Sequence, residues 1–212
     1  MLTDIRAIVF DLDGTLYVSD RLDEKIRRAV CEYAGSLKGI SPEAAADLIR
    51  ETRERLSQEQ GMEVTLSSVC EELGGDLAGF HQAITPKVHP EKCLTRDDRV
   101  VRLVTNLAAR YDLYIYTNNN PDLAGRIMNL LGISGLFREV FTIENFRRPK
   151  PDRSALERLF SAIDRHPVEC LFVGDRYDVD LRVPAEMGSA VFLVTGVQEL
   201  LKLALPAGER NP

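Results

Sequence analysis

The sequence predicts an α/β protein: a parallel β-sheet core with helices on both faces and a small all-helical domain inserted near the N-terminus. Along most of the chain, apolar segments of strand length alternate with amphipathic segments of helix length, as in βαβ units. Residues 18–87 break this alternation, because they contain helical patterns with no strand between them. We therefore expect a core domain of residues 1–17 and 88–212 and an inserted helical domain of residues 18–87.

The strands and helices of the core follow from short apolar runs and the periodic segments between them. The predicted strands are Ala7–Phe10, Leu113–Tyr116, Val140–Ile143, Cys170–Val173 and Ala190–Val194. The predicted helices are Arg96–Arg110, Asp122–Leu131, Arg153–Ile163 and Leu181–Met187. Because parallel strands need crossover helices, this order favours a parallel sheet.

The insertion is predicted as two longer helices followed by two shorter ones. The first covers Leu22–Ser36. The second begins at Ser41, which can cap the helix and is followed by a proline suited to the first turn, and it ends at Gly61. Shorter helical patterns cover Thr65–Leu73 and Asp76–Ile84. Four helices without a strand predict a second, smaller domain.

Composition excludes several classes of protein. The chain has 212 residues and a formal charge of −6, which argues against a general nucleic-acid binder. No apolar run reaches membrane-spanning length and the N-terminus lacks a leader pattern, so we expect a cytoplasmic protein without a membrane partner. Four scattered cysteines are expected to be reduced structural thiols, and three histidines to lie in loops or at the surface.

Polar side chains follow the predicted strands where each strand ends. Asp11 follows the first strand, Thr117 and Asn118 follow the second, and Asp175 follows the fourth, while Lys150 stands just beyond the third. In open parallel sheets the ligand site lies at the carboxyl ends of the strands. These side chains are therefore expected to converge on one site.

The carboxylates of this set point to a bound divalent cation. Asp11, Asp13 and Asp175 within about 6 Å of each other would repel by about 3 kcal/mol per pair at an effective dielectric constant of 20. Magnesium suits a site with few carboxylates, because it keeps waters and leaves positions for phosphate oxygens. A calcium loop starting at Asp11 is excluded, since its sixth and twelfth positions hold Leu16 and Leu22. Neither a G-x-x-x-x-G-K-[ST] loop nor a G-x-G-x-x-G fingerprint occurs.

Four motifs in order carry a family resemblance: "FDLDGTL", "YTNN", the lysine of "RRPKPD", and "GDRYDVD" followed by Gly188. Together they resemble the haloacid dehalogenase superfamily, in its phosphatase branch with a small helical cap between the first two motifs. The resemblance implies a Rossmann-like core, with the helical insertion as the cap that closes over the site and selects the substrate.

The resemblance also implies the catalytic roles. Asp11 would be the nucleophile that attacks phosphorus and forms an aspartyl-phosphate. Asp13 would protonate the leaving oxygen and then deprotonate the attacking water, since an i, i+2 pair in extended backbone points to one side. Gly14 would let the chain turn away. Tyr17 would line the entrance or, the favoured alternative, pack against the cap.

The resemblance likewise implies which residues bind the phosphate and the metal. Thr117, Asn118 and Lys150 would hold phosphoryl oxygens. Asp11, the backbone carbonyl of Asp13, and Asp175 would bind Mg²⁺. Asp180 would orient the waters on the metal. Asp178 is a rival for this last role, because acids stand at both positions.

The resulting expectation is a magnesium-dependent phosphomonoester hydrolase for a small phosphorylated metabolite, such as a nucleotide or sugar phosphate. Halide displacement is disfavoured, because the dehalogenases of the superfamily lack the second aspartate that stands here as Asp13. A phosphomutase of the same superfamily and a non-catalytic binding or regulatory module remain as alternatives.

Overall fold

The computed structural model describes residues 4–203 and divides the chain into two compact units. One unit comprises Met1–Val18 and Leu94–Pro212, and the other comprises Ser19–Cys93. The second boundary falls later in the chain than the position after residue 87 expected from the sequence. One reason is that a 3₁₀ turn, η2 (Pro90–Lys92), follows the last helix of the insertion, and Ser19 Oγ donates to the carbonyl of Cys93 at 3.1 Å.

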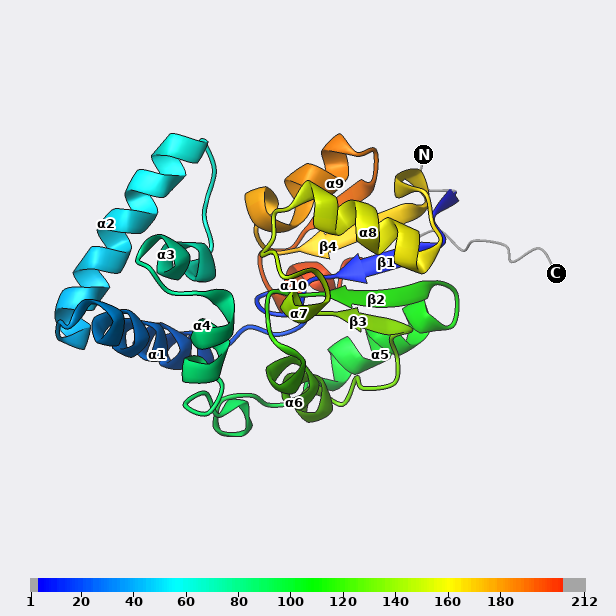
Figure 1. Ribbon diagram of the computed structural model, residues 1–212. Coiled ribbons are helices and arrows are strands. Elements are labelled where there is room, and N and C mark those ends of the chain that lie inside the picture. Colours follow the sequence, from blue (N-terminus) through cyan, green and yellow to red (C-terminus); the bar gives the residue numbers. More distant parts are fainter. Residues whose placement is uncertain (1–3, 204–212) are drawn as a thin grey trace. The chain divides into compact units, whose positions relative to one another are not determined.

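The larger unit contains a five-stranded sheet in the order β3-β2-β1-β4-β5 (Figure 1). All neighbouring strands run parallel. The strands are β1 (Ala7–Phe10), β2 (Asp112–Tyr116), β3 (Glu139–Phe141), β4 (Cys170–Gly174) and β5 (Ala190–Leu193). The predicted parallel α/β core is confirmed, and β1 lies at its centre.

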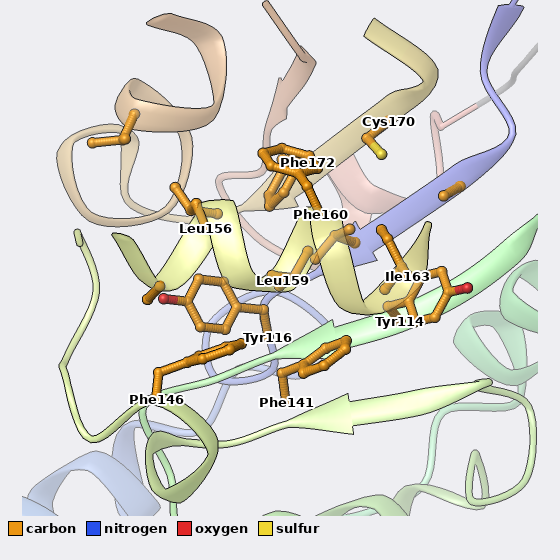
Figure 2. Packing of buried hydrophobic residues seen from close by; sticks show 14 of the residues in the cluster. Tyr114, Tyr116, Phe141, Phe146, Leu156, Leu159, Phe160, Ile163, Cys170 and Phe172 are labelled. Carbon is orange, nitrogen blue, oxygen red and sulfur yellow. The ribbon is translucent and has the colours of Figure 1, made fainter. Parts of the chain in front are cut away.

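Helices cover both faces of the sheet. Alternate strand residues join α8 (Arg153–Ile163) in one aromatic-rich cluster, in which the helix presents Leu156, Leu159 and Phe160 to the sheet (Figure 2). The strand residues of the opposite parity, such as Ile8 and Ile115, are also fully buried. A strand buried on both sides needs a layer on each face, and α5 (Asp98–Ala108) contacts β2 without joining the cluster.

The remaining elements of this unit are short, apart from one helix. They are α6 (Pro121–Leu131), α7 (Ile143–Phe146), the 3₁₀ turn η3 (Pro167–Glu169), the π-helical turn η4 (Tyr177–Leu181), α9 (Arg182–Glu186) and α10 (Val197–Leu200). The third predicted strand was too long, because Thr142 caps α7 and its backbone N–H donates to the side chain of Asn145. The helix predicted at Leu181–Met187 is present as α9, and the π-helical turn η4 precedes it.

The smaller unit consists of four helices, and each begins at a side-chain cap. They are α1 (Asp20–Lys38), α2 (Pro42–Gln60), α3 (Leu66–Glu72) and α4 (Leu77–Ile84). Their caps are Ser19, Ser41, Thr65 and Asp76, each accepting a bond from a backbone N–H in the first turn. Gly39 and Gly61 end the two long helices in the left-handed conformation.

Within residues 4–203, no helix combines the length and the apolarity that crossing a membrane would require.

Candidate active site

The strand order brings three predicted site residues to one edge of the sheet. Asp11 continues β1, and its backbone N–H donates to the Val173 carbonyl of β4 at 2.8 Å. Thr117 continues β2 on the other side of β1, and Asp175 directly follows β4. The chain builds the sheet outward from β1 to β3 and then returns to β4 beside β1. This reversal is the point at which parallel α/β sheets open a crevice for ligands.

The loop after β1 folds tightly against the loop after β4. Gly14 has a φ of +81°, and a Cβ at this position would lie 2.3 Å from Oδ2 of Asp175. A side chain is therefore excluded twice, by the backbone conformation and by the carboxylate. Thr15 completes the turn, since its hydroxyl donates to Asp11 Oδ2 at 3.2 Å.

The loop after β4 shows which of two acids, Asp178 or Asp180, lies beside Asp175. Asp180 is buried, and its Oδ2 accepts the backbone N–H of Arg176 at 3.0 Å. The close approach depends on Gly174, where a Cβ would lie 2.5 Å from the Cβ of Asp180. Asp178 instead lies near Arg182 at 3.8 Å, with 42% of its side chain exposed. The wider turn of η4, a feature often found at functional sites, contains both acids, and only Asp180 reaches the cluster.

Lys150 lies at the centre of the cluster rather than at its rim. Its side chain is 3% exposed, and Nζ donates to Oδ1 of Asp11 and to Oδ1 of Asp180, at 2.6 Å each. Nζ also donates to the carbonyl of Tyr116 at 3.0 Å and lies 5.2 Å from the centre of that ring. The backbone N–H of Lys150 donates to Oδ1 of Asn118 at 2.8 Å. One buried ammonium thus joins two carboxylates, one directly after β1 and one in η4.

The buried charges shift each other's ionisation. Burial raises the pKa of Asp11 to about 7, with Lys150 opposing the rise and the other carboxylates adding to it. Burial likewise raises the pKa of Asp175 to about 6, with a further contribution from Asp180. Burial also acts on Asp180, yet Lys150 and Arg176 hold its pKa below the usual value. The protein alone therefore does not neutralise the cluster fully.

Three carboxylates of this cluster are placed to share one cation. Asp11, Asp175 and Asp180 each offer an oxygen, and these oxygens lie within 4.8 Å of one another. Among residues 4–203, the buried Oδ1 of Asp175 accepts no hydrogen bond, and its ion-pair partner Arg176 stands 3.8 Å away, beyond hydrogen-bonding distance. Hard oxygen donors and a buried acceptor that lacks a hydrogen bond fit a magnesium ion.

Two of the three residues predicted to bind phosphate, Thr117 and Asn118, lie at the start of the loop after β2. Thr117 is buried, and its hydroxyl accepts the backbone N–H of Asn119 at 3.1 Å. Asn118 uses its Oδ1 for Lys150, while its buried Nδ2 has no hydrogen-bond partner among the described residues. An unpaired buried donor is what an incoming oxyanion would satisfy.

Sequence reasoning missed three side-chain contacts of Asp13. Tyr17 was expected to line the entrance or to pack on the cap, but its hydroxyl donates to Oδ1 of Asp13. Asn119 was quoted only as part of a motif, yet its Nδ2 donates to Oδ2 of Asp13 at 2.7 Å. Thr117 adds a long bond to the same oxygen at 3.5 Å. The polarity of "YTNN" was the available signal for Asn119; nothing in the pattern indicated the partner of Tyr17.

Comparison with characterised proteins gives relatives over most of the chain. Pyrophosphatase PpaX of Bacillus velezensis is 28% identical over 181 residues, which are 83% of this chain and 78% of that protein. A putative pyrophosphatase PpaX of Clostridium perfringens is 25% identical over 176 residues, or 82% of this chain and 78% of that protein.

Solved structures show the same fold. The putative HAD-hydrolase YfnB of Bacillus subtilis, bound to magnesium, superposes with a TM-score of 0.58 at 17% identity, covering 92% of this chain and 96% of the other. A 2-haloacid dehalogenase of Pseudomonas syringae pv. Tomato superposes with a TM-score of 0.54 at 18% identity, over 98% and 92% of the two chains. A putative hydrolase and a dehalogenase thus share this fold, so the fold alone does not identify the reaction.

A family model matches the chain over most of its length. A family model described as haloacid dehalogenase-like hydrolase matches residues 5–188, which include all the site residues described above. The chain therefore belongs to the haloacid dehalogenase-like hydrolases.

Proposed function

We propose that this hydrolase is a magnesium-dependent phosphatase that cleaves a small phosphorylated metabolite through an aspartyl-phosphate. The observation that carries the proposal is the cluster of Asp11, Asp175 and Asp180, whose oxygens lie within 4.8 Å of one another and two of whose members bind the buried Lys150. Three carboxylates and one ammonium leave a formal charge of −2, which matches one divalent cation. Two charges at that separation repel by about 3.5 kcal/mol at an effective dielectric of 20.

Asp11 is the proposed nucleophile. Its Oδ1 is held by Lys150 and its Oδ2 by the hydroxyl of Thr15, so the carboxylate is fixed in direction before a substrate arrives. One oxygen attacks phosphorus, and the bond to the leaving group breaks as the new bond forms. A fixed nucleophile needs little rearrangement on the way to the transition state.

Asp13 is the proposed acid and base. It gives a proton to the leaving oxygen and later takes one from the water that hydrolyses the intermediate. This second aspartate favours phosphoryl over halide chemistry, because a departing halide needs no proton. The substrate would be a nucleotide, a sugar phosphate or a compound of similar size.

The phosphoryl oxygens would be received by Thr117, Asn118 and Lys150. The unpaired Nδ2 of Asn118 supports this assignment most directly. Lys150 already donates to three oxygens, so its contact with a phosphoryl group would replace or share one of these bonds. The ammonium also counters the charge that develops at the reacting centre.

Magnesium would be held by Asp11, the backbone carbonyl of Asp13, and Asp175, with Asp180 orienting its waters. When bound, the ion would offset the negative charge of the carboxylates and of the phosphoryl group. The fit rests on Oδ1 of Asp175, which has no hydrogen-bond donor within residues 4–203, and on the hard oxygen donors described above.

Inorganic pyrophosphate is a second candidate substrate. It is favoured by one observation, the 28% identity with Pyrophosphatase PpaX over most of both chains. The same groups would serve, since pyrophosphate also places a phosphoryl group between a nucleophile and an oxygen leaving group.

The test measures turnover of p-nitrophenyl phosphate, a panel of small phosphomonoesters, and pyrophosphate, each with Mg²⁺ and with EDTA. Turnover that requires Mg²⁺ and is lost in Asp11→Asn supports the proposal. The preferred substrate then distinguishes a phosphomonoesterase from a pyrophosphatase. A protein that hydrolyses none of them with Mg²⁺ would instead favour a binding module. A phosphomutase would transfer the group between positions of a sugar phosphate without releasing phosphate.

A further inference from the structure

The carboxyl group of Asp13 is held by residues from the loops that follow two different strands, β1 and β2. Asp13 lies in the loop after β1, which closes on itself through the bond from Leu16 N–H to the Leu12 carbonyl at 3.1 Å. An isolated bridge joins the backbones of Asp13 and Tyr17 within this loop. The ring of Tyr17 is 5% exposed, so its hydroxyl is anchored where it meets Oδ1 of Asp13.

The other oxygen of Asp13 is held from the loop after β2. Asn119 Nδ2 donates to Oδ2 at 2.7 Å, and the backbone N–H of Asn119 donates to the hydroxyl of Thr117. The amide has one orientation that suits this contact, because reversing it would place its carbonyl oxygen against a carboxylate oxygen. Tyr17 and Asn119 therefore hold opposite corners of the same carboxyl group.

The two partners differ in what they can accept. An amide NH₂ group only donates hydrogen bonds, so Oδ2 of Asp13 stays an acceptor while Asn119 is bonded to it. A phenolic hydroxyl both donates and accepts, so Tyr17 can turn its hydrogen away and receive a bond from a protonated Oδ1. The pair therefore distinguishes two oxygens that are equivalent in a free carboxyl group.

We propose that Tyr17 and Asn119 are positioning residues that make Oδ1 of Asp13 the oxygen that carries and transfers the proton. The inference rests on the proposed role of Asp13 as acid and base. As the bond between phosphorus and the leaving oxygen breaks, its electron pair stays on that oxygen, which takes the proton from Oδ1. In the second half, a water oxygen bonds to phosphorus, the Asp11–phosphorus bond breaks, and the proton of the water returns to Oδ1.

The test compares two substrates that need this proton to different degrees. p-Nitrophenolate is a stable leaving group that departs without a proton, whereas an alkoxide is too basic to leave unprotonated. kcat and KM are measured for p-nitrophenyl phosphate and for a simple alkyl phosphate with the parent protein, Tyr17→Phe and Asn119→Ala. Tyr114→Phe is the matched control, because it also removes a hydroxyl from a buried tyrosine, in the aromatic cluster on the sheet.

For both site variants we expect kcat/KM on the alkyl ester to fall about tenfold or more, and kcat/KM on p-nitrophenyl phosphate to fall less than about threefold. The comparison uses kcat/KM because this constant reports the steps up to departure of the leaving group and excludes hydrolysis of the intermediate, which both esters share. Tyr114→Phe should leave the ratio between the substrates unaltered. The ratio is measured on one preparation, so a loss of folded protein cancels from it.

Two other results overturn the inference, and they are distinguishable. The alkyl ester is one that the parent protein hydrolyses in the panel described above, and a parent protein that hydrolyses no member of that panel with Mg²⁺ removes the proposed function and the inference with it. A parent protein that hydrolyses both, with variants that lose both equally or lose neither, leaves the phosphatase intact and refutes the positioning role alone.

Discussion

The carboxylate of Asp175 occupies the space that a side chain at position 14 would need, because a Cβ on Gly14 would lie 2.3 Å from Asp175 Oδ2. The acid that follows β4 and the loop that follows β1 are therefore in direct contact through a glycine. The two parts of the acidic cluster approach each other only because that position is bare.

Gly14→Ala should impair both stability and metal binding. The alanine would have to keep a φ of +81°, and its methyl group would have to displace Asp175. We therefore expect the free energy of unfolding to fall by about 2 kcal/mol or more and Mg²⁺ binding to become at least tenfold weaker. Urea unfolding and a calorimetric Mg²⁺ titration measure the two effects. Gly39→Ala is the matched control: its φ is +68° with no atom within 4 Å, so it should cost about 1 kcal/mol and leave Mg²⁺ binding unchanged. Equal effects from both variants would contradict the close approach.

Asp175→Asn should remove most of the stabilisation that Mg²⁺ gives to the folded protein. A ligand that binds only the folded state raises its melting temperature, and an amide in place of this carboxylate weakens that ligand. We expect the rise in melting temperature with Mg²⁺ to shrink to a small fraction of the parental rise. Asp178→Asn changes an acid outside the cluster and should retain the full rise in melting temperature. If this variant lost the rise, Asp178 would belong to the metal site, contrary to the prediction.

Lys150→Met should destabilise the metal-free protein, because it leaves Asp11 and Asp180 buried without their shared ammonium. Removing one partner of a buried ion pair typically costs about 3–5 kcal/mol. Unfolding is followed by circular dichroism in EDTA at neutral pH. The exposed Arg148, 3.7 Å from Asp152, supplies the control, since Arg148→Met should change stability by less than about 1 kcal/mol. Similar small losses for both would mean that the lysine contributes little to the folded state.

His81 should make the stability of the helical unit depend on pH. The sequence placed this residue in a loop or at the surface, but it lies in α4, with a buried Nε2 that has no hydrogen-bond partner among the described residues. Burial lowers the pKa of His81 to about 4, from an unfolded value of 6.5. The unfolded chain therefore binds the proton more readily, so the stability is full above pH 6.5 and is lost as the pH falls toward 4.

For this prediction the free energy of unfolding is compared between pH 7.5 and pH 5. We expect the parent to lose about 1–2 kcal/mol more than His81→Leu, an amount reduced from the full linkage value because part of the ring meets solvent. His89→Leu, which changes an exposed histidine of the same unit, should behave like the parent. A parent and His81→Leu with identical pH profiles would show that His81 titrates normally.

The sequence predicted the part of the site that depends on strand ends. Asp11, Thr117 and Asp175 could be placed together because parallel strands end at one edge of the sheet, and each apolar run marks its own end. The positions of side chains further from the strand ends were harder to predict. Asp178 and Asp180 could not be separated from spacing alone, because the π-helical turn changes the angle between successive residues.

The contacts made across loops were outside the reach of pattern reasoning. Tyr17 was expected to line the entrance or to pack against the cap, and the pattern did not indicate that its hydroxyl would donate to Asp13, four residues earlier in the same loop. The unexpected α7 begins at Thr142, whose backbone N–H donates to the side chain of Asn145. The apolar run through Ile143 had indicated a strand there instead. Periodicity reports which face is buried, whereas single polar bonds decide where a short segment turns.

The central position of β1 also governs when activity appears during refolding. Its neighbours, β2 and β4, come from more than a hundred residues further along the chain, so the crevice forms only after distant segments have met. Helices of the inserted unit form from neighbouring residues and need no such encounter. On dilution from denaturant, helical signal should therefore recover ahead of turnover, with the reactive centre among the last features to assemble.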